Sequence, residues 1–279
     1  MKKRKKLKML FLVTILAIIG IIIYLNIPYS PVKTEYWKKI NNIEKKQAKE
    51  QGIISKDDLR VLPEAIQKYF INNGYLGIEK TSEVMFSFKN VDFSMGLNKP
   101  NIKIDYIVYD FTNNLSRLAL IDTKMFKIPF QGIDIYENGQ GSMKGVIAKN
   151  VTLFNEKGDD MNSGALVTYL SECLMHPSLA LQKNIKYKEI DKYTVEATIV
   201  DNDIKVSGIF YFNESYEMTS FQSKRFAEDT DSYENWSAVA SNYKKIKGIN
   251  TPTRLQAIWH YDKGDLIYFD SKSMEIYYK

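Results

Sequence analysis

An apolar run from Met9 to Ile27, preceded by a strongly basic start, constrains this chain more than any other feature of its sequence. At about 1.5 Å per residue, a helix of this run spans roughly the 30 Å hydrocarbon core of a bilayer. The basic start should stay in the cytoplasm, because positively charged flanks are retained there. The sequence therefore predicts four parts: a cytoplasmic segment 1–8, a transmembrane anchor 9–27, a juxtamembrane stalk 28–58 and an extracytoplasmic domain 59–279.

A cleavable signal peptide shares this pattern of a basic start and an apolar stretch. The run is long for a signal core, no small-x-small cleavage site follows it, and no cysteine stands there for lipidation. These features favour an uncleaved anchor. Under either interpretation the remainder is exported, because no stretch after Pro28 is long and apolar enough to span a bilayer.

The charge balance separates the N-terminal segment from the rest of the chain. Of 39 Lys and Arg, six lie in the first eight residues, which leaves 33 to balance the 33 Asp and Glu. The basic character of the whole chain is thus a topology signal. The exported part has no excess positive charge that would attract nucleic acid, and we expect no nucleic-acid partner.

The patterning changes from helical to strand-like along the exported part. Trp37, Ile40 and Ile43 form a thin apolar stripe at helical spacing, which predicts a stalk helix, and "LPEAIQKYFINNG" predicts a second helix. From Ser82 onward, alternating and aromatic segments predict about ten strands joined by short turns. A helical stretch at about 162–181 interrupts them.

Successive strands without a βαβ rhythm predict an antiparallel sheet, and a sheet this wide must curl or close. We therefore expect an α+β fold in which a large curled antiparallel sheet, half-barrel or barrel-like, wraps around one or two helices and follows one transmembrane helix. The helix at 162–181 is the expected wrapped element. Cys173, the one cysteine of the chain, should be buried there.

The segment "ECLMHP" places Glu172, Cys173 and His176 within five residues. Glu172 and His176 are four apart and would share a helix face, a spacing that suits two metal ligands or an acid and a base. The other histidine, His260, is predicted on a strand face opposite to its aromatic neighbours. No HExxH motif, cysteine pair or carboxylate cluster accompanies them, so we expect no metal site. His176 is more simply explained as the end of a helix before Pro177.

Other motifs are better explained by turns than by chemistry. No GxSxG elbow occurs, and Cys173 with His176 on one short helix lacks a separately oriented base, which argues against nucleophilic catalysis. The glycines of "ENGQGSMKG" lead into a strand, which indicates a hairpin or bulge and not a phosphate loop. The acidic "AEDTDSYEN" lacks the spacing of a calcium loop and reads as a hairpin tip. We expect no cofactor.

The aromatic residues offer a different kind of site. The chain has 19 Tyr, 14 Phe and 3 Trp, and many of them lie in the predicted strands. A curled sheet lined by such side chains can enclose an apolar ligand, or the same side chains can simply fill the core. If a ligand is bound, Phe210, Tyr211 and Trp259 are the candidate contacts.

Several blocks of the sequence resemble a bacterial family of exported or membrane proteins that is known as a domain of unknown function. The blocks are "LPEAIQKYF" with "NNGYLG", "GIDIYENGQGSMKG", "GALVTYLSECLMHPSLAL" and "GINTPTRLQAIWHYDKGDLIYFDSKSMEIYY", and they span about residues 60–279. The resemblance implies a shared role for Glu172 and Pro177, whereas the position of His176 varies. The closing block also resembles the last hairpins of envelope lipoprotein-carrier half-barrels, which hold acyl chains.

The sequence thus favours a noncatalytic binding module for a lipid or another apolar envelope component, attached to the cell membrane through residues 9–27. One alternative is an envelope hydrolase that uses Glu172 with His176 or His260. Another is a structural or interaction protein whose core is filled. The last alternative predicts that the curled sheet encloses no cavity.

Overall fold

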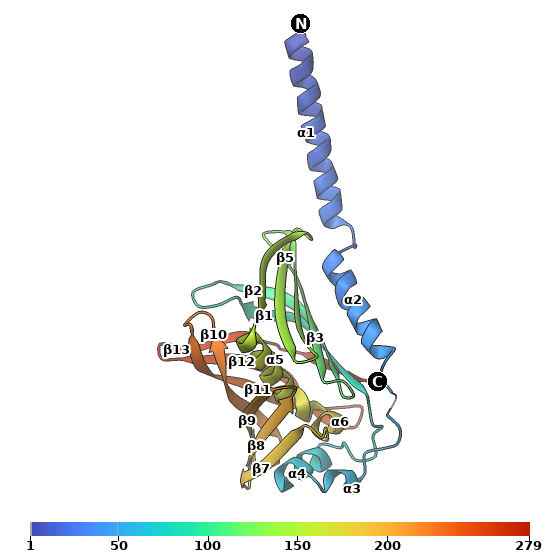
Figure 1. Ribbon diagram of the computed structural model, residues 1–279, viewed down its shortest axis with the longest axis vertical. Helices are drawn as coiled ribbons and strands as arrows, with labels where there is room; N and C mark the ends of the chain where they lie inside the picture. Colours follow the sequence, from blue (N-terminus) through green and yellow to red (C-terminus); the bar gives the residue numbers. More distant parts are fainter. Residues whose placement is uncertain (1, 49) are drawn as a thin grey trace.

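The computed structural model describes residues 2–48 and 50–279. Its helices are α1 (Lys2–Asn26), α2 (Pro31–Glu44), α3 (Lys56–Leu59), α4 (Glu64–Asn72), α5 (Asp159–Glu172), the 3-10 helix η1 (Cys173–Met175) and α6 (Pro177–Ala180). Helix α1 stands away from the other elements, with its side chains exposed along nearly its whole length (Figure 1). One helical stretch of the described residues, Lys3–Glu44, is long and apolar enough to cross a membrane by length and composition, a test that a signal sequence also passes.

Within the described residues, fourteen strands form a single sheet. They are β1 (Glu83–Ser94), β2 (Asn101–Phe111), β3 (Ser116–Met125), β4 (Ile128–Glu137), β5 (Gln140–Ile147), β6 (Val151–Lys157), β7 (Ile185–Asp191), β8 (Thr194–Asp201), β9 (Ile204–Phe212), β10 (Met218–Ala227), β11 (Ser232–Ile246), β12 (Ile249–Tyr261), β13 (Gly264–Asp270) and β14 (Met274–Tyr278).

The strand order is β6-β5-β4-β3-β2-β1-β13-β12-β11-β10-β9-β8-β7, with β14 paired to β1. Two meanders, β1 to β6 and β7 to β13, therefore meet where β1 pairs antiparallel with β13. So many twisted strands cannot stay flat, and the sheet curls into a half-barrel (Figure 1). The predicted α+β class and curled antiparallel sheet are confirmed, with fourteen strands in place of the smaller number expected.

The connection between the two edge strands places a helix inside the curl. β6 and β7 lie at opposite edges of the sheet, and the segment that joins them contains α5, η1 and α6. Helix α5 contacts β5, β9 and β10, so it crosses the concave face. Gly141 on β5 permits this approach, because a Cβ there would collide with the carbonyl oxygen of Met161.

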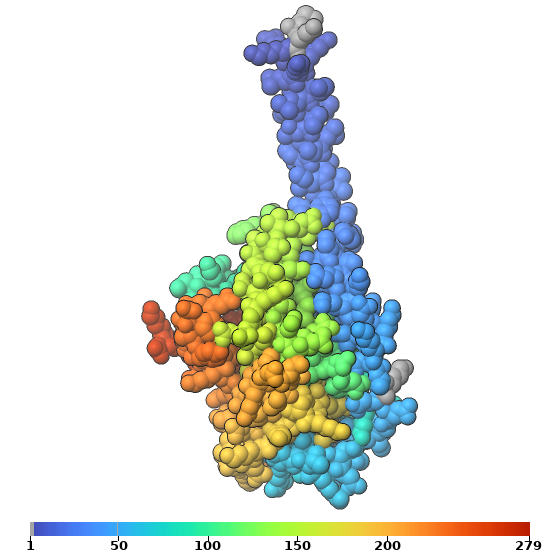
Figure 2. Space-filling view, viewed as in Figure 1, coloured from blue at the N-terminus to red at the C-terminus, as the bar shows by residue number. Residues whose placement is uncertain are grey.

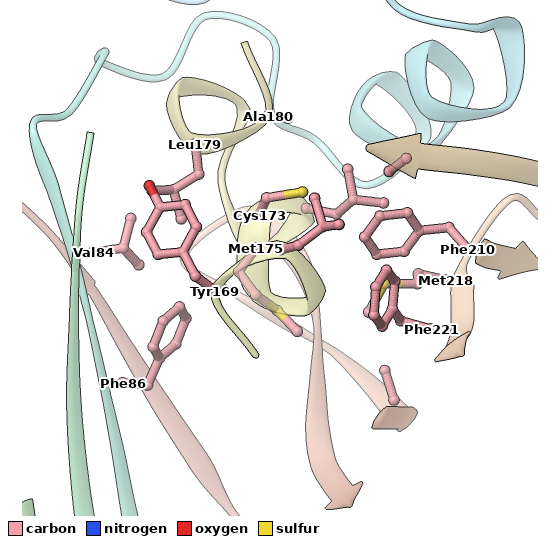
Figure 3. Packing of buried hydrophobic residues seen from close by; sticks show 14 of the residues in the cluster. Val84, Phe86, Tyr169, Cys173, Met175, Leu179, Ala180, Phe210, Met218 and Phe221 are labelled. Carbon is pink, nitrogen blue, oxygen red and sulfur yellow. The ribbon is translucent and has the colours of Figure 1, made fainter. Parts of the chain in front are cut away.

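The main apolar core lies between α5 and the concave face. Leu166, Tyr169 and Leu170 of α5 are each at most 1 % exposed and pack into it. Cys173 is fully buried beside this helix end, where Figure 3 shows it among the core side chains. Burial raises the pKa of the Cys173 thiol to about 12, so the group stays protonated and unreactive.

A second, smaller core lies on the convex face, where α2 packs against β2, β3, β4 and β5. Four apolar side chains of α2 are buried there: Val32, Tyr36, Ile40 and Ile43. The Tyr36 hydroxyl lies 3.3 Å from the carbonyl oxygens of both Ile107 and Leu118, and Lys39 pairs with Glu137 at 3.1 Å. The helix expected in the 28–58 stalk therefore lies on the sheet, while the division between membrane and exported parts stays a prediction.

We predict that Ile40→Ala lowers the free energy of unfolding by about 2–4 kcal/mol, because it leaves a cavity between α2 and the sheet. The measurement is chemical unfolding of the full chain in detergent micelles. The matched control is Lys38→Ala on the exposed face of α2, which should change stability by less than about 0.5 kcal/mol. Equal effects of the two substitutions would show that α2 does not pack on the sheet.

Candidate ligand-binding site

A cavity of about 470 Å³ lies between α5 and the concave face of the sheet. Most of its wall is aromatic, aliphatic or methionine side chains, among them Phe88, Phe93, Trp236, Trp259 and Phe269. The β1–β2 turn, the end of β6 and the β10–β11 turn contribute to its rim. A recess is visible there between the lime-green and orange parts of the surface (Figure 2). Its volume falls within the range of small-molecule sites.

Small side chains on β11 and β12 keep this space open. Ala238 and Ala257 are cross-strand partners, Ala240 follows on β11, and all three line the cavity. Side chains at alternate positions of a strand point to the same face, so these methyl groups replace what would otherwise be bulky inward-facing residues. The curl of the sheet and these three alanines together leave the part of the concave face around the cavity unfilled.

A buried ion-pair cluster forms one part of the cavity wall. Arg117 on β3 is 2 % exposed and donates from Nε and Nη2 to both carboxylate oxygens of Glu172, at 2.7 and 3.0 Å. It also donates from Nη1 to Asp134 at 2.8 Å and from Nη2 to the Tyr106 hydroxyl at 2.9 Å. Glu172 ends α5, where the helix dipole disfavours a negative charge, and the bidentate guanidinium compensates for this.

A third carboxyl group, that of Asp110, lies beside this cluster. Asp110 is fully buried, stands opposite Arg117 on the neighbouring strand, and neither of its oxygens has a hydrogen-bond partner among the described residues. Burial first, and then the Glu172 carboxylate, raise the pKa of Asp110 well above its ordinary value. This shift favours the neutral form of Asp110, so that the cluster balances one guanidinium against the carboxylates of Glu172 and Asp134.

The raised pKa of Asp110 predicts how stability depends on pH. The unfolded chain loses this proton above about pH 4, whereas the folded chain keeps it to a higher pH, so the stability contribution of Asp110 falls as pH rises. Asp110→Asn removes this titration, and each unit of pKa shift is worth about 1.4 kcal/mol. The variant should therefore gain melting temperature relative to the wild type, by about 3 °C or more at pH 8 and progressively less toward pH 4.

Thermal unfolding of the full chain in detergent between pH 4 and pH 8 measures this effect. Asp134→Asn is the matched control, because Asp134 belongs to the same cluster but accepts a hydrogen bond from Arg117. That control should lose stability at neutral pH. A gain for Asp110→Asn that does not grow with pH would contradict a protonated Asp110.

The structure does not bring Glu172 and His176 together as an acid–base pair, and the expected shared helix face is wrong. Helix α5 ends at Glu172, and His176 has an extended backbone because Pro177 follows it. His176 is fully buried, caps α6 by accepting from the Ser178 N–H at 3.1 Å, and packs against the Tyr278 ring. Burial lowers the pKa of His176 to about 3, so it is a neutral core residue.

His260 lies on the convex side of β12, in a different groove from the cavity. Its Nε2 is 2.8 Å from Ser237 Oγ and its Nδ1 is 2.8 Å from an oxygen of Asp265, the order of atoms in a Ser-His-Asp triad. Ser237, however, is 2 % exposed and lies mid-strand between β10 and β12. Those ladders occupy the strand backbone, which leaves no oxyanion site, so we interpret the three residues as a polar link between strands.

The three aromatic candidates occupy different places. Trp259 is on the cavity wall. Phe210 is fully buried in the packed core below it, with its ring 4.7 Å from that of Phe221 (Figure 3), and it does not line the cavity. Tyr211 follows Phe210 on β9 and faces the other side of the sheet. A ligand contact for Trp259 stays a prediction, whereas Phe210 and Tyr211 lie outside this site.

Sequence reasoning missed Arg117, Asp134 and Arg225, which are charged side chains in the lining of the cavity. A signal for the first was present. Asp110 and Arg117 are each the charged residue of an apolar strand segment, "YIVYDF" and "LSRLAL", and the short turn between the segments makes them cross-strand partners. Charged groups at inward strand positions are rare unless they are paired or functional.

The fold and cavity define a curled-sheet protein with an internal site. A model of the family of unknown function DUF6544 matches residues 52–271, so this protein belongs to that family, and the expected membership of an uncharacterised family is confirmed. No curated protein matches the chain. Among solved structures, a LolA superfamily protein from Nitrosomonas europaea is similar, at 10% identity and a TM-score of 0.42, over 82% of this chain and 94% of that one.

Proposed function

We propose that this protein is a membrane-anchored, extracytoplasmic binding module that holds a lipid or another apolar envelope molecule in the cavity between α5 and the sheet, without catalysis. The observation that carries this proposal is the cavity itself, about 470 Å³ in volume and mostly apolar in its lining. A curved sheet with an aromatic inner face buries an acyl chain favourably, because each buried CH₂ contributes about 0.8 kcal/mol.

The two alternative functions have less support. The hydrolase hypothesis needs Glu172 close to His176 or His260, but Glu172 is held by Arg117, His176 is in the core and His260 is on the convex face. The structural hypothesis predicted a filled core, whereas the concave face has an open cavity. Binding without chemistry is the function that fits both the space and the placement of the polar groups.

A photoreactive ligand tests binding in this cavity. The full chain in detergent micelles is irradiated with palmitic acid that carries a mid-chain diazirine, and the cross-linked peptides are mapped by mass spectrometry. Labelling should fall on β11, β12 and α5, and unlabelled palmitic acid should compete. The apolar α1 will also be labelled within the micelle. Labelling of α1 therefore serves as an internal control for the amount of probe in each sample.

Ala238→Phe should reduce cavity labelling by about tenfold or more, because the larger side chain fills the space beside Ala257. The matched control is Ser207→Phe, at an exposed position on β9. This control should leave labelling of both the cavity and α1 unchanged. Undiminished cavity labelling in Ala238→Phe, or no cavity labelling in the wild type, would contradict the proposal.

The surface beside the end of α1 supports attachment to a membrane. Lys149, in the β5–β6 turn, donates to the carbonyl oxygen of Ile27 at 2.9 Å and is 3 % exposed. The neighbouring β3–β4 turn places Phe126 at its tip, 92 % exposed, followed by Lys127. The β3–β4 and β5–β6 turns lie side by side, because the Ala148 N–H donates to the Pro129 carbonyl oxygen at 2.9 Å.

The β3–β4 and β5–β6 turns contain residue types that are unusual for their backbone conformation. Phe126 and Lys127 both have positive φ, as do Ala148 and Lys149, a conformation that Asn and Gly adopt most easily. The β4–β5 turn of the same sheet does use Asn-Gly. An exposed Phe with adjacent Lys suits the bilayer interface, where the ring enters the headgroup layer and the amines meet phosphates.

We therefore predict that Phe126 contacts the bilayer when the full chain is reconstituted in lipid vesicles. Phe126→Cys labelled with an environment-sensitive nitrobenzoxadiazole dye should show blue-shifted emission and quenching by spin-labelled lipid. The buried Cys173 should not react with the dye. Ile190→Cys on β7, which is half exposed and at the other end of the domain, is the matched control and should show neither effect (Figure 1). Equal spectra at both positions would disprove the contact.

A further inference from the structure

The cavity wall contains a second arginine, Arg225 on β10, whose side chain forms no hydrogen bond or ion pair with the described residues. Four arginines follow the N-terminal segment, and three pair with carboxylates: Arg60 with Asp57, Arg117 with Glu172 and Asp134, and Arg254 with Asp270. Arg225 pairs with none of the described carboxylates, and its Nε is buried without an acceptor among the described residues. Arg225 as a whole is only partly buried, but a buried N–H donor without an acceptor is costly, and an acceptor on a molecule in the cavity would satisfy it.

Aromatic and backbone contacts fix this guanidinium at the cavity wall. It lies 4.9 Å from the ring centre of Trp236 and 5.5 Å from that of Trp259, both of which line the cavity. On the other side a Cβ at Gly164 of α5 would lie 3.3 Å from Arg225 Nη2, so the helix backbone limits its movement. Cation–π contacts stabilise the charge without using any of its N–H donors.

The acidic residues near Arg225 do not neutralise it. Glu234 is its cross-strand partner on β11, but the Glu234 carboxylate accepts instead from Ser232 at 2.9 Å. At the rim of the cavity, Asp229 accepts from the Leu97 N–H at 2.9 Å. The donors of Arg225 therefore remain available to a molecule in the cavity.

We propose that Arg225 binds an anionic headgroup, a carboxylate or a phosphate monoester, of an amphiphile whose apolar chain occupies the cavity. This inference rests on the proposed binding function and names the class of ligand. The planar guanidinium presents parallel N–H donors that match two oxygens of a carboxylate or phosphate, and Trp236 and Trp259 hold it in that orientation. Arg117 is less suited to this role, because Glu172, Asp134 and Tyr106 already accept from four of its five N–H donors.

Three probes with the same chain and the same mid-chain diazirine test this proposal on the full chain in detergent micelles: palmitic acid, hexadecanol and hexadecyl phosphate. Cross-links to cavity peptides are measured against cross-links to α1 over a range of concentrations. At least one of the two acids should half-saturate the cavity at about a tenfold lower concentration than hexadecanol, because hydrogen bonds to charged groups are the strong ones. The acid that is preferred identifies the headgroup.

Arg225→Met should abolish the preference for acid while hexadecanol labelling persists. Lys224→Met, at the neighbouring exposed position, is the matched control and should keep the preference. Arg225→Lys retains the charge and should keep a reduced preference, which covers the case in which Arg225→Met does not fold. Equal labelling by acid and alcohol in the wild type would overturn the headgroup assignment and leave the binding function standing. No cavity labelling by any probe would overturn both.

Discussion

The ion pair between Arg117 and Glu172 fixes where helix α5 lies within the curled sheet. Glu172 is the last residue of α5, and Arg117 lies on β3 with 2 % of its surface exposed. Removing Arg117 would leave the carboxylates of both Glu172 and Asp134 without their cation, which is among the most destabilising changes in a protein. The helix thus has one position along the concave face, and the packed core and the open cavity follow from that position.

One part of the concave face next to this ion pair is filled by packed side chains, and another part is the open cavity. Cys173, Phe210 and Phe221 are fully buried in the filled part. In the open part, Ala238, Ala240 and Ala257 replace large inward side chains, and the cavity adjoins both arginines of the interior. Arg117 is paired with two protein carboxylates and links α5 to the sheet. Arg225 packs against Trp236 and Trp259, and its N–H donors can therefore bind a ligand.

The sequence predicted the class of fold because local patterns determine it. Alternation after Ser82 and the absence of a βαβ rhythm led to a curled antiparallel sheet, and helical spacing around Leu166 and Tyr169 led to the helix inside it. The extended backbone of His176 was missed, although the proline that follows it disfavours a helical conformation there. The expected number of strands was too low, because the ends of strands are poorly marked in the sequence. Neighbouring strands such as β5 and β6, which only a short turn separates, look like one segment.

The site could not be predicted in the same way, because it depends on contacts between distant segments. Arg117 and Glu172 are 55 residues apart, and no local pattern places a strand residue at the end of a helix. Phe210 and Trp259 both point toward the concave face by strand alternation. Where α5 crosses that face decides that Phe210 lies in the packed core and that Trp259 lies on the cavity wall. The docking of α2 was hidden for the same reason: its stripe was visible, but its partner surface on the convex face was not.

We propose that an amphiphile occupies this cavity in the membrane from which the protein is purified. Native mass spectrometry of the full chain, released from detergent micelles and followed by solvent extraction, measures this directly. We expect one bound molecule with an apolar chain and an acidic headgroup, which is absent from Ala238→Phe prepared in parallel. A wild-type spectrum with only the mass of the bare chain, unchanged after incubation with palmitic acid or hexadecyl phosphate, would show that the cavity holds no such ligand.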